Sequence, residues 1–103
     1  MSTDEERYGI MKRSLEVLIE KLDSLKKDEP YWSTRIDAIR KDIDNDNIGV
    51  EGDTVELKLR SLKKVADESP QNTRRMASSK KVKDIQDALV EYRNAFADYH
   101  HHP

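Results

Sequence analysis

The basic side chains between residues 57 and 83 are the part of this sequence best suited to bind a ligand. This segment holds nine Lys or Arg residues and only two acidic residues. Such a cluster of cations can neutralise the phosphates of a nucleic acid, a nucleotide or a lipid headgroup. Ser78 and Ser79 lie at a possible helix start within it and add hydroxyls and amides that can bind an anion. The candidate phosphate-binding residues are Arg74, Arg75, Lys80, Lys81, Lys83, Lys63 and Lys64.

The same charges are also suited to stabilise the protein itself. Residues 1–56 hold fifteen acidic and nine basic side chains, and residues 84–103 hold four acidic and one basic. The basic segment can therefore lie against acidic helices of its own chain or of a partner subunit, which is the interpretation we favour. No aromatic residue is interleaved in residues 57–83, which argues against a surface that stacks single-stranded bases. The pI of about 5.9 argues against a protein that coats DNA.

The sequence offers little for catalysis or for a cofactor. Its 103 residues contain no cysteine, which excludes thiolate zinc sites, disulfides and a Cys nucleophile. A Gly-rich phosphate loop and a recognisable Ser nucleophile motif are also missing. The histidines are adjacent at positions 100–102, and we interpret residues 100–103 as a flexible His-rich tail. We therefore predict a protein that is not an enzyme, with no catalytic residue, no metal site and no cofactor.

The composition also bears on where the chain resides. Charged residues make up 39% of the sequence, and no apolar run approaches the roughly 20 residues of a membrane-spanning helix. The first residues, up to Glu6, are polar and acidic, unlike those of a signal peptide. We expect a soluble cytoplasmic protein without membrane contact.

Two long amphipathic helices are predicted at the two ends of the sequence. Apolar residues recur at alternating steps of three and four, which is typical of a helix with one buried face. The two stripes are Tyr8, Met11, Leu15, Leu18, Leu22 and Leu25, and Val82, Ile85, Leu89, Tyr92, Phe96 and Tyr99. Thr3 and Glu6 have the spacing of a capping box at the start of the first helix. Because both stripes have six positions and span about 27 Å, we expect these helices to pack along each other, within the chain or between chains.

Two shorter segments lie between these helices. Trp32, Ile36, Ile39 and Ile43 repeat at helical spacing, and Pro30 suits the first turn of that helix. Residues 44–53 are rich in turn-forming Asn, Asp and Gly. Beyond them, either Asp53 caps a helix over residues 54–67, or residues 48–59 form a β-hairpin. We prefer the helix because it accounts for a longer span, with a stripe of Val55, Leu59, Leu62 and Ala66.

The predicted fold is all-α: a small three- or four-helix bundle whose long N- and C-terminal helices pack together. We expect a single domain over residues 1–99, with helices at about 3–27, 30–44, 54–67 and 73–99. An apolar share of 35% is low for a solitary core of this size, so we also expect a homodimer. Ile10 and Val17, seven residues apart, lie on a second face of the first helix. The candidate interface residues are Ile10, Val17 and Trp32, although Trp32 equally suits the core.

Two function classes follow from these patterns. The first is a non-catalytic module for protein–protein interaction, an adaptor or inhibitor, that presents helix faces and a bipolar charge surface to a protein partner. The alternative is a binder of nucleic acid, of a nucleotide or of another phosphate-bearing ligand through residues 57–83.

Ionic strength separates the two classes. Phosphate binding is expected to weaken steeply with added salt and with the double substitution Arg74→Glu/Arg75→Glu, because both remove cation–phosphate attraction. The measurement is a titration with labelled duplex DNA, single-stranded DNA and a nucleotide panel. Failure of all of these ligands to bind at about 50 mM salt excludes the phosphate-binding alternative.

Overall fold

The computed structural model describes residues 3–45, 53–68 and 73–100, except for the side chains of residues 53 and 73–76. These residues form the α-helices α1 (Asp4–Asp28), α2 (Ser33–Asn45), α3 (Asp53–Glu68) and α4 (Thr73–His100). A 3-10 helix, η1 (Pro30–Trp32), joins α1 to α2. The described residues contain no strand, so the all-α prediction is confirmed and the bundle has four helices.

Two details concern the segments that the sequence left open. Residues 53–68 are helical from Asp53 onward, as in the helix alternative, and residues 48–52 of the possible hairpin lie outside the described part. His100 was expected in a flexible tail but is the last residue of α4, with its ring 4.1 Å from the ring of Phe96. Residues 101–103 lie outside the described part.

Helix α1 begins and ends with defined hydrogen bonds. The hydroxyl of Thr3 accepts a hydrogen bond of 3.1 Å from the backbone N–H of Glu6, which satisfies one of the free donors of the first turn. At the other end, the N–H of Glu29 donates to the carbonyl of Leu25, and the carbonyl of Glu29 accepts from Trp32. The chain therefore turns directly from α1 into η1 and α2.

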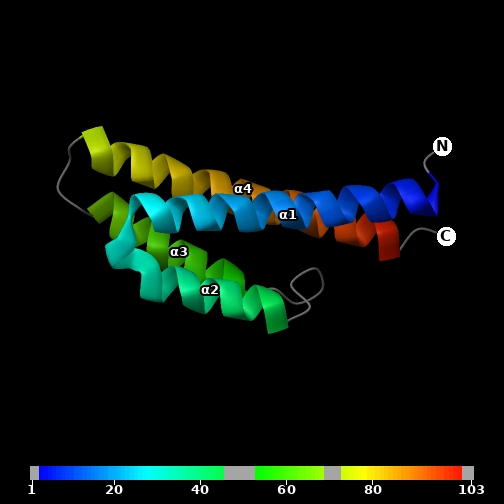
Figure 1. Cartoon of the computed structure of the whole chain (residues 1–103), viewed down its shortest axis with the longest axis horizontal. Coiled ribbons are helices and arrows are strands. Elements are labelled where there is room, and N and C mark those ends of the chain that lie inside the picture. The colour runs from blue at the N-terminus through cyan, green and yellow to red at the C-terminus, as the bar shows by residue number, and fades with distance from the viewer. Residues whose placement is uncertain (1–2, 46–52, 69–72, 101–103) are drawn as a thin grey trace.

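Helices α1 and α4 pack antiparallel along their whole length (Figure 1). Tyr8 contacts Tyr99 at one end, Ser78 bonds to Glu29 at the other, and in both pairs the residue numbers add up to 107. Because the helices rise equally per residue, all residues whose numbers add up to 107 lie at the same level. The two predicted stripes obey this rule at every position, since Leu15 pairs with Tyr92, Leu18 with Leu89 and Leu22 with Ile85. The stripes therefore meet within one chain.

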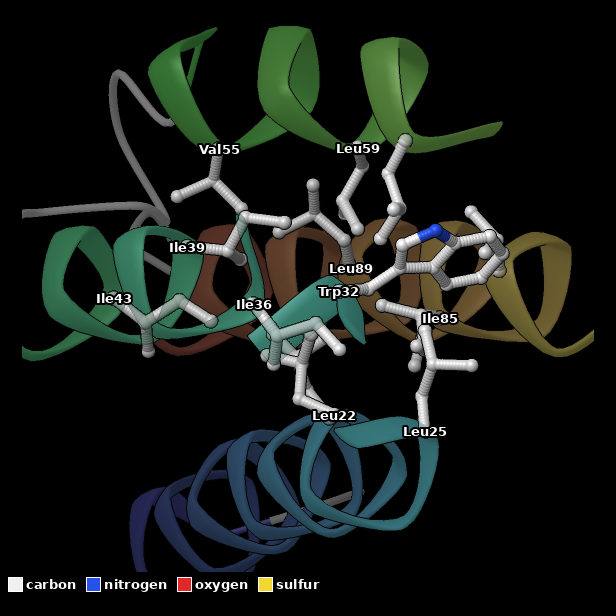
Figure 2. Packing of buried hydrophobic residues seen from close by; sticks show 14 of the residues in the cluster. Leu22, Leu25, Trp32, Ile36, Ile39, Ile43, Val55, Leu59, Ile85 and Leu89 are labelled. Carbon is white, nitrogen blue, oxygen red and sulfur yellow. The ribbon is translucent and has the colours of Figure 1, made fainter. Parts of the chain in front are cut away.

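Helices α2 and α3 form a second layer over one part of this pair. Leu22 and Leu25 point from α1, and Val55 and Leu59 from α3, toward a common core (Figure 2). Trp32 is 3% exposed in this core. Ion pairs hold the layers in register at the core's edge, with Lys26–Asp37 at 2.7 Å and Arg40–Asp23 at 3.4 Å between α1 and α2. Lys58 and Asp42 join α3 to α2.

The second layer is shorter than the first. Helices α1 and α4 continue beyond the ends of α2 and α3, and the first residue of α1 and the last residue of α4 lie at that extension (Figure 1). We call this extension the two-helix end and define it as residues 4–15 of α1 and 92–100 of α4. Only its inner edge contacts the second layer, through the ion pair of 2.9 Å between Arg93 and Glu56 of α3. Beyond this edge, the stripe residues of α1 and α4 face each other without the second helical layer.

Burial in the four-helix part predicts how much each leucine stabilises the fold. Leu22→Ala is expected to lower the free energy of unfolding by about 2–5 kcal/mol, because Leu22 is fully buried between the layers. Leu57→Ala is the matched control, since that side chain is 60% exposed on α3 and its loss should change stability by about 0.5 kcal/mol or less. The measurement is urea unfolding followed by circular dichroism. Equal losses in the two variants would contradict this packing.

Candidate interaction surface

Exposure of the two stripes increases along the two-helix end. Leu18, Leu22 and Leu25 and their counterparts on α4 are buried. Beyond them, Leu15, Met11 and Phe96 are only partly buried, and Tyr8 is 45% exposed. The gradient follows from the missing second layer, because α1 and α4 each cover only one side of the other helix. The same apolar stripe that forms the core therefore becomes accessible surface.

The accessible part is mainly aromatic. The rings of Tyr8 and Tyr99 lie with centroids 5.4 Å apart, and the partly buried ring of Phe96 lies 6.0 Å from the buried ring of Tyr92. The ammonium of Lys12 lies 5.6 Å from the centroid of the Tyr8 ring. Tyrosine combines a large apolar ring with a hydroxyl that can reach water or a partner, so it suits a surface that is alternately exposed and buried. Aromatic residues are enriched in protein–protein interfaces for this reason.

A buried arginine joins α1 to α4 within the two-helix end. The side chain of Arg7 is only 7% exposed. Its guanidinium lies 3.2 Å from Asp4 on its own helix and 3.6 Å from Asp98 on α4. A cation bound to both helices disfavours their separation, because either carboxylate alone would leave a buried charge poorly compensated. The aromatic surface is therefore presented on a closed pair of helices.

The predicted interface residues Ile10 and Val17 lie on a different face of α1 from Tyr8. Ile10 is 55% exposed. Val17 lines a shallow groove of 340 Å³ between α1 and α4, together with Ala88 and the charged residues Lys21, Asp84, Asp87 and Glu91. This groove is largely polar at its rim. The structure thus brings Val17 to a helix–helix groove and Ile10 to exposed surface.

Trp32, the third predicted interface residue, belongs to the hydrophobic core. It packs in the cluster with residues from all four helices, and its ring contacts that of Tyr31 with centroids 5.2 Å apart. With 3% of its surface exposed, Trp32 is not available to a partner in this fold. Of its two interpretations, the structure favours the core position.

Most described cations of the basic segment contact carboxylates of the same chain. Lys63 lies 2.7 Å from Asp67, Lys64 4.0 Å from Glu68 and Lys83 3.2 Å from Asp87, all one turn apart on a helix. Lys81 pairs with Asp28 on α1. Lys80 is exposed and has no ion-pair partner among the described residues. The side chains of Arg74 and Arg75 lie outside the described part.

Because of these pairs, the uneven charge along the sequence does not correspond to an equal separation of charge in the folded protein. Each exposed pair contributes little to stability, but each places an anion within 4.0 Å or less of a cation of the basic segment. The described side chains thus support the self-complementary interpretation, in which the cations lie against acidic residues of their own chain. The net charge of a segment overstates the charge separation in space.

Two of the acidic residues have pKa values shifted by these contacts. The pKa of Glu56 is lowered below its ordinary value of 4.5, mainly by the hydrogen bond from Arg93 and then by the charge of Arg60. The pKa of Asp67 is lowered from 3.8, mainly by the hydrogen bond from Lys63 and then by that from Ser79. Both shifts favour the ionised carboxylate in the folded chain.

Sequence reasoning did not single out Tyr8, Phe96, Arg7 or Glu29 as special. The signal for Tyr8 and Phe96 was present in the predicted helix lengths, because two helices of 25 or more residues cannot be covered by two of about 15. Glu29 is a carboxylate with 1% exposure that accepts a hydrogen bond from the Ser78 hydroxyl. No spacing in the sequence marks this contact, which joins residues far apart in the chain.

Three further findings concern metal ions, membranes and related proteins. Within the described residues, no group of three or more His, Asp or Glu side chains is arranged to hold a metal ion. No described helix has the length and apolar character needed to cross a membrane. In comparisons with protein-family models, curated proteins and solved structures, no match to this chain was found.

Acid is expected to weaken the contact between α3 and α4. Because the pKa of Glu56 is lower in the folded chain, its ionisation stabilises the fold above pH 4.5, and this contribution is lost as the pH falls through the lowered value. Glu56→Gln should therefore reduce the free energy of unfolding at pH 7, with the difference from wild type shrinking as the pH falls below 4.5. Glu20→Gln is the control, since Glu20 is exposed and has no ion-pair partner among the described residues. A difference for Glu56→Gln that does not change with pH in urea unfolding would refute this assignment.

Proposed function

We propose that this protein is a non-catalytic helical module for protein–protein interaction, and that it binds through the two-helix end of α1 and α4. The observation that carries the proposal is the continuation of the core stripe beyond its second layer. There, Tyr8 is 45% exposed, and Met11, Leu15 and Phe96 are partly buried. An apolar surface of this kind, rimmed by polar residues, is typical of an interaction site.

The chemistry of this surface favours a protein partner. Aromatic rings with polar edges, and charges of both signs, line it: Tyr8 and Tyr99 together with Lys12, Glu5 and Asp98. A helix or helix pair can pack against such a stripe as ridges into grooves. An adaptor or inhibitor role fits such a module, because this role requires a binding surface and no catalytic group. The cytoplasm, expected from the sequence, is compatible with this role.

Phosphate binding through residues 57–83 has weaker support. Of the seven candidate cations, Lys63, Lys64, Lys81 and Lys83 contact carboxylates. A phosphate would have to compete with these contacts. We therefore place the basic segment second as a binding surface and assign its charges mainly to contacts within the chain.

Site-specific photocrosslinking tests the proposed surface. A photoreactive phenylalanine analogue at position 8 keeps an aromatic ring there and is expected to crosslink to a protein in the native host. The same analogue at Tyr31 is the matched control, because Tyr31 is 56% exposed but follows α1 at the opposite end of the molecule (Figure 1). The measurement is a mass shift on a denaturing gel, followed by identification of the adduct. Absence of any protein adduct at position 8, or equal adducts at both positions, would contradict the proposal.

A further inference from the structure

We propose that the partner of the two-helix end is a second copy of this chain. This inference rests on the proposed function and specifies its partner. In the dimer, the two-helix ends of both copies pack antiparallel across a two-fold axis. Helix α1 of the partner subunit then takes the place beside α1 that α2 takes in the four-helix part.

The number of helical layers favours a second copy as the partner. The four-helix part has two helix pairs, α1 with α4 and α2 with α3 (Figure 1). The two-helix end has one pair and an uncovered stripe. A second copy brings another helix pair of the same length with the same stripe, so it restores the second layer. Two-fold packing of identical surfaces is the commonest symmetry of protein dimers.

The face of α1 that α2 contacts continues into the two-helix end. In the four-helix part, α2 contacts the face of α1 that carries Asp23 and Lys26, which pair with Arg40 and Asp37. Eighteen residues are about five turns of an α-helix. Glu5 and Tyr8 therefore repeat the positions of Asp23 and Lys26 on the same face. Lys12 lies on it as well, because it precedes Asp23 by about three turns.

The charges on this face are complementary between two copies of the chain. Glu5 and Lys12 are exposed, and neither has an ion-pair partner among the described residues. Antiparallel packing about an axis between residues 8 and 9 brings Glu5 opposite Lys12 of the partner subunit. The two-fold axis repeats this pair, so two ion pairs flank the centre of the contact. The position of Lys12 beside the Tyr8 ring keeps its charge on this face.

Gly9 is a glycine that the chain's own contacts do not explain. Gly9 lies inside α1, where glycine is less favourable than alanine by about 1 kcal/mol. A Cβ atom added at Gly9 would meet no atom within 4 Å. In the register that pairs Glu5 with Lys12 of the partner subunit, Tyr8 lies opposite Gly9 of the partner subunit. A residue without a side chain leaves room there for the tyrosine ring and a close helix approach.

Charge reversal tests this register. Glu5→Lys and Lys12→Glu should each raise the Kd of the dimer by about fivefold or more at low salt, because each turns two attractive pairs into repulsive ones. The double variant Glu5→Lys/Lys12→Glu restores the pairing and should return the Kd to within about twofold of wild type. Sedimentation equilibrium over a range of protein concentrations measures all four chains. Single variants that dimerise like wild type, or a double variant as weak as the single ones, overturn the register.

Gly9→Gln is the second test, and in this variant weaker association cannot be mistaken for loss of folding. Glutamine favours the helix, so this variant should unfold at a higher temperature when it is dilute and monomeric. Its side chain fills the space opposite Tyr8, so its dimer Kd should rise by about tenfold or more. Higher stability combined with weaker association supports the close contact at Gly9. Association unchanged by Gly9→Gln overturns it.

The remaining outcomes separate this inference from the proposed function. Loss of the dimer on Val17→Lys but not on Glu5→Lys assigns the contact to the groove at Val17 and overturns the inference. A wild-type chain that remains monomeric at high concentration also overturns it. If that monomer still crosslinks through position 8 to another protein, the proposed function stands and only the second copy is refuted. If position 8 crosslinks neither to a second copy nor to another protein, both the inference and the proposed function are refuted.

Discussion

The structure depends on the antiparallel register of α1 and α4. From the Tyr8–Tyr99 contact to the Glu29–Ser78 hydrogen bond, opposite residues keep the same sum of residue numbers. If one helix advanced by one residue along its own screw, its stripe would turn away from the other helix by about 100°. The buried polar contacts at the two ends oppose such a shift, because moving either helix would leave the charge of Arg7 or the carboxylate of Glu29 with a lost partner. All other packing takes place on this pair.

The unequal lengths of the helices divide the molecule into two parts. Where α2 and α3 cover the pair, the stripe residues are fully buried and contribute most of the hydrophobic stabilisation. Where they do not, the same kind of residue remains accessible. In the two-helix end, the stripe packs α1 against α4, and the side of it that α2 and α3 do not cover remains accessible to a partner. The proposed interaction module and the proposed dimer both follow from this difference in length.

The charged side chains interact with near neighbours in the fold and not as whole charged segments of the sequence. The basic segment contacts acidic residues one helical turn away or on the neighbouring helix, as Lys63 does with Asp67 and Lys81 with Asp28. At about 150 mM salt, exposed charges more than about 8 Å apart are largely screened. Helix geometry and packing therefore determine which charges form ion pairs, and the net charge of the 27 residues 57–83 does not describe these contacts. Glu5 and Lys12, which have no such partner among the described residues, are therefore more informative about an interface.

The sequence by itself determined the all-α class, the capping of α1 by Thr3 and the two matched stripes, because helical periodicity and capping are local properties of neighbouring residues. It also favoured the helix over the hairpin after residue 53. That the stripes pair within one chain was decided by the tertiary structure. Only the tertiary structure decided that Trp32 is buried, that Val17 lines a groove away from the aromatic surface, and that Tyr8 and Phe96 lie beyond the second layer. It also brought Glu29 to Ser78. Exposure of these residues depends on which helices end at the same level, and that is set by packing between segments distant in the chain.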